Sequence, residues 1–315
     1  MSTPDVAAII ISLNSRHFLE GCLRSLKSTQ WDGYSREIIV VDNGSTDGTL
    51  EFLRSEHPDV RVIANPQNVG YCAAGNQGAA ISSARHLFFL NDDILFYDNS
   101  IPLLVRFLEE HPEAGIIGSR LMNPDGTDQF SSGRTFPHPM NALFSRKSPL
   151  TRMFPNTKWA KGYLLQGKFN DPEPFEVDWI SAAALMITRE CFEKAGRLVE
   201  DFYYFHEQIL CARAKAAGYK VYLHPQSKIL HYEGAGSGVR TRAIRLKHIE
   251  RFHVAAYRWF CLHHRLGRFH PLRLLAAGAL VARAAALMLW ERLKPEPAEI
   301  RAQWQQGRPP GGVPL

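Results

Sequence analysis

The chain has 315 residues, of which 45% are hydrophobic and 22% charged, proportions that are ordinary for a globular protein with a sizeable core. Its five cysteines show no paired spacing, which argues against a disulfide framework or a zinc ribbon and fits a reducing cytoplasm. The N-terminus has no basic stretch followed by an apolar one, so no secretory signal is expected.

The formal net charge of +6 is distributed unevenly along the chain. Residues 1–239 carry 23 Lys and Arg against 27 Asp and Glu, whereas residues 240–294 carry 12 against 2. A basic segment on a slightly acidic body indicates an anionic partner, which is either a lipid surface or a nucleic acid.

Apolar runs alternate with helical periodicities over the first 118 residues. Continuous apolar runs of this length are typical of strands buried in a parallel sheet. The predicted strands are 6–12, 37–42, 60–64, the run that begins at His86, and 114–118. The predicted helices between them follow Asn14 or Ser15, cover 49–56 and 72–84, and run from about Pro102 to His111. This alternation predicts right-handed βαβ units and an α/β fold.

Polar side chains follow three of these strands. Asn14 comes after the first, Asp42 ends the second, and Asn91, Asp92 and Asp93 end the run from His86. Because parallel strands deliver their carboxyl ends to one edge of a sheet, we expect these groups to converge there. Oxygen ligands at such an edge are suited to a divalent cation that in turn holds a diphosphate. Taken alone, the trio at 91–93 could equally be a helix N-cap or a turn.

The middle of the chain is less regular. Residues 123–174 lose periodicity and gain Pro, Gly and Ser, which is typical of a functional loop. A strand is expected over 177–188, helices over 189–195 and 209–217, and a short strand over 220–223. His231 is expected in a glycine-rich loop that follows.

Two helices are predicted near the C-terminus, a basic one over 240–259 and an apolar one over 272–293, separated by Pro271. Arg273 and Arg283 interrupt the apolar run, so a membrane span is not expected. Two interpretations stay open: a helix that lies in the lipid interface with its arginines at the headgroups, or a helix packed on the body. From Pro295 onward the chain is expected to be disordered.

Four segments resemble, in order, the family 2 glycosyltransferases. They are Ile-Ser-Leu-Asn14, Val-Val-Asp-Asn-Gly-Ser-Thr-Asp-Gly48, Asn-Val-Gly-Tyr-Cys-Ala-Ala-Gly-Asn76 and Phe-Leu-Asn-Asp-Asp93. Asp-Trp-Ile-Ser181 and the segment at His231 extend the match, and the similarity is greatest to the rhamnosyltransferase and galactofuranosyltransferase-like branch. The resemblance implies a GT-A fold, a nucleotide-diphosphate sugar donor, Mg²⁺ or Mn²⁺, and inversion at the anomeric carbon.

The resemblance also assigns roles to residues of this chain. It implies that Ser12, Asn14 and Asp42 hold the nucleoside, and that Asn68 and Asn76 belong to the donor-binding loop. It places Asn91 and Asp92 in the metal-binding motif and makes Asp93 the main metal ligand, with His231 as a second one. A loop histidine with no ligand remains the alternative for His231.

The family's catalytic base is a carboxylate before an amphipathic helix, and here the sequence departs from the pattern. Gln208 stands where the family has Asp, and a Gln amide does not accept a proton at neutral pH. Glu207 is therefore the candidate base. The alternative is that Glu207 is structural and that activity is altered or lost. Leu13 and Leu198-Val-Glu200 also depart from the pattern, which affects the acceptor side of the site more than the donor side.

The resulting organisation is a GT-A domain over 1–239, a helical extension over 240–294 and a tail over 295–315. The leading hypothesis is an inverting sugar transferase that uses a glycan or glycolipid acceptor, at the cytoplasmic face of a membrane with an anionic surface. A deoxyhexose such as rhamnose is the donor sugar that the branch suggests. The competing hypothesis is a non-catalytic nucleotide-sugar-binding or assembly protein. A nucleic-acid partner is not expected, because no zinc pattern or aromatic sheet motif accompanies the basic segment.

Overall fold

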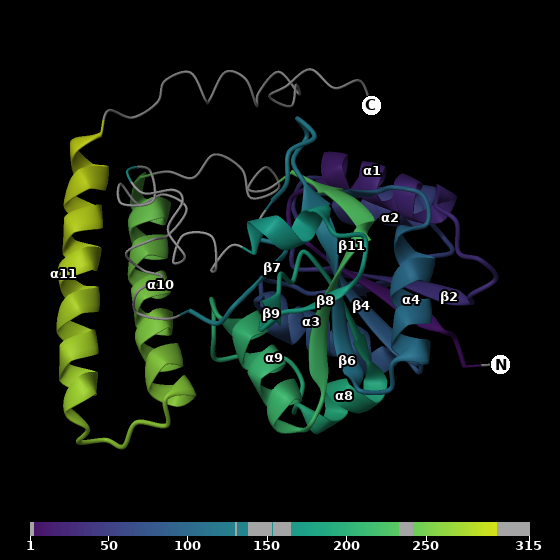
Figure 1. The fold of residues 1–315 in the computed structure, drawn as a ribbon. Coiled ribbons are helices and arrows are strands. Elements are labelled where there is room, and N and C mark those ends of the chain that lie inside the picture. The colour runs from purple at the N-terminus through teal and green to yellow at the C-terminus, as the bar shows by residue number, and fades with distance from the viewer. Residues whose placement is uncertain (1–2, 130, 138–152, 154–164, 233–241, 295–315) are drawn as a thin grey trace.

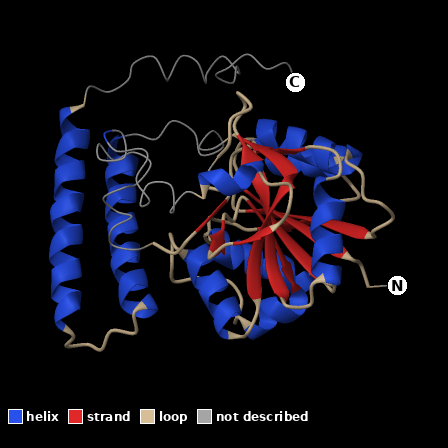
Figure 2. Ribbon diagram, viewed as in Figure 1, coloured by secondary structure: helices blue, strands red, loops and turns tan. Residues whose placement is uncertain are grey.

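A computed structural model describes residues 3–129, 131–137, 153, 165–232 and 242–294 of the chain. These residues form a sheet with helices on both faces and, to one side, a pair of long helices (Figure 1). Figure 2 shows the strands gathered in the middle of the body, while the pair beside it is entirely helical.

The strands of the main sheet cover most of the body. They are β1 (Val6–Ser12), β2 (Arg36–Asp42), β3 (Arg61–Ala64), β4 (His86–Asn91), β5 (Ile94–Phe96), β6 (Ala114–Met122), β8 (Phe175–Glu176), β10 (Ala184–Thr188) and β11 (Lys220–His231). A small second sheet pairs β7 (Gly133–Arg134) with β9 (Trp179–Ile180).

The helices connect these strands and then extend beyond them. In the body they are α1 (Arg16–Ser28), α2 (Thr49–Glu56), α3 (Tyr71–Ile81), α4 (Ser100–Glu110), the 3₁₀ helix η1 (Gln166–Asn170), α8 (Arg189–Lys194) and α9 (His206–Ala216). The pair beside the body is α10 (Arg242–His263) and α11 (Pro271–Leu293).

The strand order in the described sheet is β3-β2-β1-β4-β10-β6-β11-β5, with β8 paired to β11. The first four strands of this order are parallel to one another, and β6 is parallel to β11. β10 runs antiparallel between β4 and β6. The predicted α/β fold, with a mainly parallel sheet and a C-terminal helical extension, is therefore confirmed.

The two faces of the sheet bury separate cores. On one face Ala8 and Ile10 of β1 pack with α1, α2 and α4, and on the other Ile9 packs with α3, α8 and α9. The small residues of α3 let it lie close to the sheet, because a Cβ on Gly78 would be 2.5 Å from Ile9 Cγ2. This close packing holds the loop before α3 at the carboxyl ends of β1 and β2.

Two expectations about local structure are corrected. The run 177–188 is two strands, because a turn after Ser181 separates β9 from β10, which belong to different sheets. The short strand predicted at 220–223 is the beginning of β11, which continues to His231 through a register shift between His224 and Lys228. An irregularity of this kind lets the strand continue past Pro225. His231 is therefore the last residue of a strand and not part of a loop.

Helices α10 and α11 form a hairpin, and α10 attaches it to the body. Ala255 and Trp259 of α10 pack with Phe202 and Ile209 of the body, and Tyr204 Oη and His248 Nδ1 lie 2.5 Å apart. The predicted helices are thus present, with α10 packed on the body and α11 packed on α10. The predicted tail from Pro295 lies outside the described residues.

Arg273 and Arg283 of α11 contact α10 and do not reach away from the protein, contrary to one of the two sequence interpretations. Arg283 Nη1 lies 2.8 Å from His253 Nε2, and Arg273 Nε donates to Tyr257 Oη at 3.3 Å. Both partners belong to α10. By length and composition Pro271–Leu293 would also be able to cross a membrane, which the two arginines had argued against.

Candidate active site at the sheet edge

The carboxyl ends of β1, β2 and β4 meet as predicted. In the parallel register Ser12 lies opposite Asp42, and Ile11 lies opposite Asn91. The residues that follow these strands therefore share one edge of the sheet, and helices α1, α2 and α3 begin next to it.

A cavity of about 1150 Å³ adjoins this edge, which is large enough for a nucleotide sugar together with part of an acceptor. Four of the residues singled out in the sequence line it: Asn68, Asn91, Glu207 and His231. Ser12, Asn14, Asp42, Asn76, Asp92 and Asp93 are not among its lining residues.

Asp42 organises the loop between β2 and α2. Its Oδ2 accepts hydrogen bonds from the backbone N–H groups of Gly44 and Ser45 at 3.3 and 3.1 Å. Its Oδ1 is buried and has no hydrogen-bond partner among the described residues. A buried carboxylate oxygen without a partner is unfavourable, so this atom is a good acceptor for a donor group on a ligand.

Asn14 and Ser12 make contacts within the protein. Asn14 Oδ1 accepts a hydrogen bond from the Thr46 backbone N–H at 2.7 Å, so it ties the end of β1 to the loop after β2. Ser12 is fully buried, and its hydroxyl lies 3.3 Å from that of Ser15. The nucleoside contacts that the resemblance implies for these two residues stay predictions.

Asp92 points into the protein, beneath the edge. Its Oδ2 accepts a hydrogen bond from the hydroxyl of Ser15, the N-cap residue of α1. Burial, with a contribution from the neighbouring Asp93, raises the pKa of Asp92 to about 7. The observed contacts of Asp92 thus anchor the start of α1, and a direct role with the donor stays a prediction.

Asp93, between β4 and β5, and His231, at the end of β11, face each other across the edge. Asp93 Oδ1 is buried, has no hydrogen-bond partner among the described residues and lies 3.4 Å from His231 Nε2. His231 Nδ1 lies 2.8 Å from Gln129 Oε1, while Gln129 Nε2 donates to the His231 carbonyl oxygen at 2.7 Å. Because the Gln129 amide donates through its nitrogen, its oxygen accepts, and the proton of a neutral His231 is on Nδ1. The lone pair on Nε2 then faces the Asp93 carboxylate.

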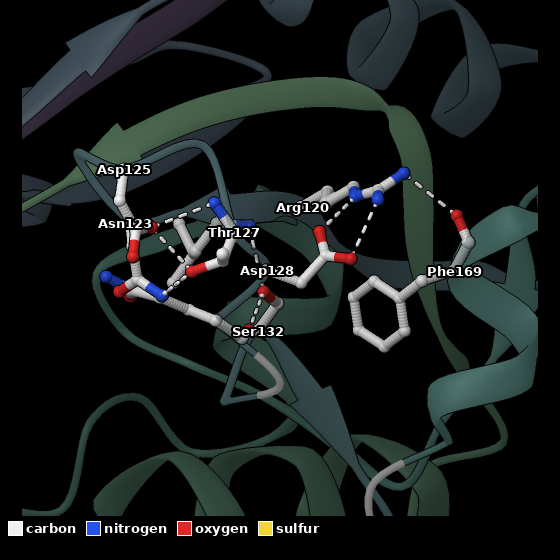
Figure 3. Close-up of polar contacts among 9 residues, drawn as sticks. Arg120, Asn123, Asp125, Thr127, Asp128, Ser132 and Phe169 are labelled. Atoms are coloured by element: carbon white, nitrogen blue, oxygen red, sulfur yellow. Dashed lines mark hydrogen bonds and ion pairs between the residues drawn. The ribbon is translucent and has the colours of Figure 1, made fainter.

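Gln129 is a residue that the sequence did not reveal. It is fully buried and lies 102 positions before His231, so no local pattern connects the two. Figure 3 shows the polar network that holds its segment. Arg120 pairs with Asp128 through two nitrogens at 2.5 and 2.8 Å and donates to the Phe169 carbonyl oxygen, and Ser132 Oγ donates to the Gln129 carbonyl oxygen.

The chemistry of this pair fits a divalent cation. When His231 is neutral, its Nε2 lone pair and the Asp93 carboxylate oxygen repel each other, and a cation would satisfy both. Within the residues that the structure describes, no group of three or more His, Cys, Asp or Glu side chains surrounds such a position. The remaining coordination positions would go to oxygens of a diphosphate and to water, as Mg²⁺ sites commonly have them. Asn91 Nδ2 lies 3.4 Å from His231 Nε2 on the same side.

Glu207 lies in the first turn of α9 and lines the cavity. Phe205, the residue before the helix, has a left-handed backbone with φ of 67°, which is uncommon for a bulky side chain. This turn directs Glu207 to the cavity, whereas Gln208 is buried. Glu207 contributes, after burial, to raising the pKa of Tyr71 well above its usual range, so the two side chains are neighbours.

The two donor-loop asparagines lie in different surroundings. Asn68 lines the cavity, and its Oδ1 accepts a hydrogen bond from the Gly70 N–H at 2.8 Å. The amide of Asn76 donates to the Leu198 carbonyl oxygen and to Glu200 Oε1, both at 2.9 Å. Asn76 thus ties α3 to the segment before α9, and donor binding by either asparagine stays a prediction.

Helix α10 forms the wall of the cavity that lies away from the sheet. Lys247, Arg251 and Arg258 are on this wall, together with Glu250 and Val254. Arg251 lies over the Tyr203 ring at 4.6 Å and Arg258 over the Phe202 ring at 4.2 Å. The sequence showed the charge of this helix but not that it borders the site.

Comparisons with known proteins agree with this geometry. The family model for glycosyl transferase family 2 matches residues 7–172. An N-acetylglucosaminyl-diphospho-decaprenol L-rhamnosyltransferase of Mycobacterium tuberculosis is 26% identical over 78% of this chain and 81% of its own length. An O-antigen biosynthesis protein of Myxococcus xanthus, RfbC, is 27% identical over 74% of this chain but only 18% of its own length.

Solved structures share the architecture. A mannosyltransferase of Pyrobaculum calidifontis in complex with GDP-Man and Mn²⁺ matches 98% of this chain and 80% of its own, with a TM-score of 0.55 at 17% identity. GalNAc-T7 with UDP, GalNAc and Mn²⁺ matches 74% of this chain and 45% of its own, also with a TM-score of 0.55, at 16% identity. The predicted GT-A fold is therefore confirmed.

Proposed function

The chain belongs to glycosyl transferase family 2, in its rhamnosyltransferase-like branch, and from this membership we propose that it transfers a sugar from a nucleotide-diphosphate donor to a hydroxyl group of a lipid-linked or polysaccharide acceptor. The observation that carries the proposal is the pair formed by Asp93 and His231. Asp93 Oδ1, which has no hydrogen-bond partner in the described part of the chain, lies 3.4 Å from His231 Nε2, where the sheet edge borders a cavity of about 1150 Å³.

Asp93 and His231 would hold a divalent cation, Mg²⁺ or Mn²⁺. When bound, such a cation neutralises charge on the diphosphate as that group leaves the sugar, which lowers the barrier by several kcal/mol. Asn91 lies beside the pair and would orient a phosphate oxygen or a water through its amide. The Asp42 Oδ1 atom, buried without a partner, would accept a hydrogen bond from the nucleoside.

Glu207 would act as the general base. Its side chain is held in the cavity by the first turn of α9 and is about one fifth exposed, with a relative accessibility of 19%. It would accept the proton of the acceptor hydroxyl as the oxygen attacks the anomeric carbon, and a single displacement of this kind inverts the configuration. Phe202, Tyr203 and Tyr204 line the same cavity and would pack on the acceptor sugar.

The acceptor is proposed to carry phosphate. The relative from Mycobacterium tuberculosis is named for a diphospho-decaprenol substrate. In this chain Lys247, Arg251 and Arg258 give the α10 wall a positive charge suited to such a group. We propose rhamnose or a similar deoxyhexose as the donor sugar, and the cytoplasmic face of a membrane as the place of action. The proposed units are a GT-A domain over 1–239, a helical extension over 240–294 and a tail over 295–315.

The test is the metal-dependent release of nucleoside diphosphate from a panel of nucleotide sugars. Asp93→Ala should reduce the release at least ~10³-fold, because it removes one of the two cation ligands on the protein. Asp98→Ala, at an exposed aspartate on the same stretch of chain, is the matched control and should retain the rate. A rate that Asp93→Ala leaves unchanged would contradict the proposal. Donor binding by calorimetry without turnover on any acceptor would favour the non-catalytic binding or assembly protein instead.

A further inference from the structure

The side of α11 that faces away from α10 is apolar along its whole length. Leu274 and Leu293 near its two ends are 80% and 72% exposed, and Val281 in the middle is 69% exposed. The other large apolar side chains exposed on the hairpin turn and on this helix are Phe269, Leu272, Leu275, Leu287, Leu289 and Trp290. The apolar stretch of α11 has none of its residues buried.

Three polar side chains of α11, those of Arg273, Arg283 and Glu291, contact α10 instead. Arg273 bonds to Tyr257, Arg283 lies 2.8 Å from His253 Nε2, and Glu291 pairs with Arg245. At the end of the hairpin Arg242 donates to the Lys294 carbonyl oxygen at 2.7 Å. These three side chains of α11 are therefore bonded to α10, and most of the outer face of α11 is left apolar.

This arrangement is the reverse of that of a helix on the surface of a water-soluble protein, which turns its apolar stripe toward the core. A contiguous apolar surface of this extent is uncommon on a monomer and indicates an interaction site. Basic residues lie at both ends of the apolar face, with Arg265 and Arg268 in the hairpin turn and Arg292 and Lys294 at the end of α11. An apolar face between basic ends is complementary to a lipid interface with anionic headgroups.

We propose that the α10–α11 hairpin attaches the protein to an anionic lipid surface, with α11 lying in the plane of the interface. α11 satisfies the length and composition of a membrane span, but it bonds to α10 from Arg273 near its start to Glu291 near its end. α10 carries too many charged residues to enter the hydrocarbon with it. Both helices therefore lie along the surface, with the outer face of α11 in the lipid.

The same hairpin connects the lipid surface to the catalytic cavity. α10 lines the cavity with Lys247, Arg251 and Arg258, and it packs against α11 with its other side. Because packed helices lie ~8–10 Å apart, the cavity wall is about one helix layer from the lipid. A lipid-linked acceptor with a phosphate next to its sugar would span this distance. This step rests on the proposed function, whereas attachment to lipid does not.

The experiment is co-sedimentation of the full chain with vesicles, without donor or metal. Vesicles of equal parts phosphatidylcholine and phosphatidylglycerol should bind the protein, and pure phosphatidylcholine vesicles should bind it at least ~10-fold more weakly. The double variant Leu275→Glu with Leu289→Glu should lose at least ~10-fold in binding, because two charges would enter the apolar region. Ile81→Glu, at an exposed apolar position of α3, is the matched control and should bind like the wild type.

Two readouts keep a loss of binding interpretable. The double variant should keep the helical circular dichroism and the donor hydrolysis rate of the wild type, since its substitutions lie outside the cavity. The proposal is overturned if the double variant binds vesicles as well as the wild type. It is also overturned if the wild type forms a dimer in vesicle-free solution that the double variant does not, because a second copy would then cover the face. Vesicle binding without any transferase activity would refute the proposed function and leave this inference standing.

Discussion

The body and the hairpin of this protein use their side chains in opposite ways. In the body, apolar residues on both faces of the sheet are buried beneath helices, and the polar residues gather where β1, β2 and β4 end. In the hairpin, Arg273 and Arg283 of α11 bond to α10, and the large apolar residues of α11 are exposed on its outer face. The body is thus built for a water-filled cavity, and the hairpin for contact with a lipid surface.

The two regions meet at α10. One side of α10 borders the cavity, and the other side bonds to α11. Chemistry at the sheet edge should then be separable from attachment through the hairpin: substitutions at the edge should change turnover or metal use without changing vesicle binding. Each prediction below tests this separation.

The largest effect in this set is expected at Glu207. Glu207→Gln removes the proton acceptor but keeps the size of the side chain, so turnover should fall by ~10²–10⁴-fold, the range of a general base. Donor affinity and vesicle binding should not change. The measurement is steady-state transfer to an acceptor, with donor binding followed by calorimetry.

Asp201→Asn is the matched comparison for Glu207, because Asp201 is another carboxylate that lines the cavity. We expect it to retain most of the transfer rate. If Asp201→Asn loses turnover while Glu207→Gln keeps it, the base has been assigned to the wrong residue.

The body shows which features a sequence reveals. β1 and α2 have the predicted bounds, because a continuous apolar run and a short amphipathic stretch are local signals. The convergence of Asp42 with Asn91 could also be predicted, since parallel strands deliver their ends to one edge. What could not be predicted is which way each side chain points there. Asp92 turns inward to Ser15 while the adjacent Asp93 faces His231, a choice made by packing from distant strands.

The hairpin shows which features a sequence does not reveal. Its helices were predicted from a basic and an apolar stretch on either side of Pro271, but the positions of Arg273 and Arg283 depend on Tyr257 and His253 of the other helix. From the sequence of one helix alone, its charged side chains are expected to reach solvent or headgroups. Only the pairing of the two helices shows that Arg273 and Arg283 bond to α10 and leave the outer face of α11 mainly apolar.

An intermediate effect is expected at Gln129, which we regard as a positioning residue. Gln129→Leu removes the acceptor of the His231 Nδ1–H group, so the ring would no longer be held with Nε2 toward Asp93. The Mn²⁺ concentration for half-maximal activity should rise by ~10–100-fold, as for other residues that orient a metal-binding histidine. Mn²⁺ binding in the presence of nucleoside diphosphate, followed by electron paramagnetic resonance, should weaken by the same factor.

A conservative variant distinguishes this role from a purely structural one. Gln129→Glu keeps an oxygen that accepts from Nδ1–H and should restore much of the Mn²⁺ affinity. Asn123→Ala, in the same segment but bonded to Thr127, should leave the Mn²⁺ requirement near that of the wild type. Equal Mn²⁺ affinity in Gln129→Leu and the wild type would show that Gln129 does not orient His231 for a metal.

The smallest effect is expected on stability and concerns buried histidines. In the body the ring nitrogens of His86 and the Nδ1 of His224 are buried without hydrogen-bond partners among the described residues, whereas His253 of the hairpin lies within bonding distance of Arg283 and Ile249. Burial lowers the pKa of His86 and of His224 to about 4, with a further contribution from Arg85 at His86. Burial also lowers the pKa of His253 and His263 of the hairpin, but the shifts to about 4 are those of His86 and His224, so acid should act mainly on the body.

The direction of the pH effect on stability follows from whether the folded or the unfolded state binds protons first. Below pH ~6.5 the unfolded chain protonates these histidines while the folded protein does not, so their contribution to stability is complete above pH ~6.5 and is lost as the pH falls toward 4. At pH 5 the loss is about 2 kcal/mol for each ring.

His224→Gln should therefore reduce the difference in unfolding free energy between pH 7 and pH 5 by about 2 kcal/mol, measured by chemical denaturation. His111→Gln, at a side chain that is 43% exposed, is the control and should change this difference by less than ~0.5 kcal/mol. If His224→Gln leaves the difference as large as in the wild type, the acid sensitivity does not originate in the buried rings of the body, and this contrast between the two regions does not hold.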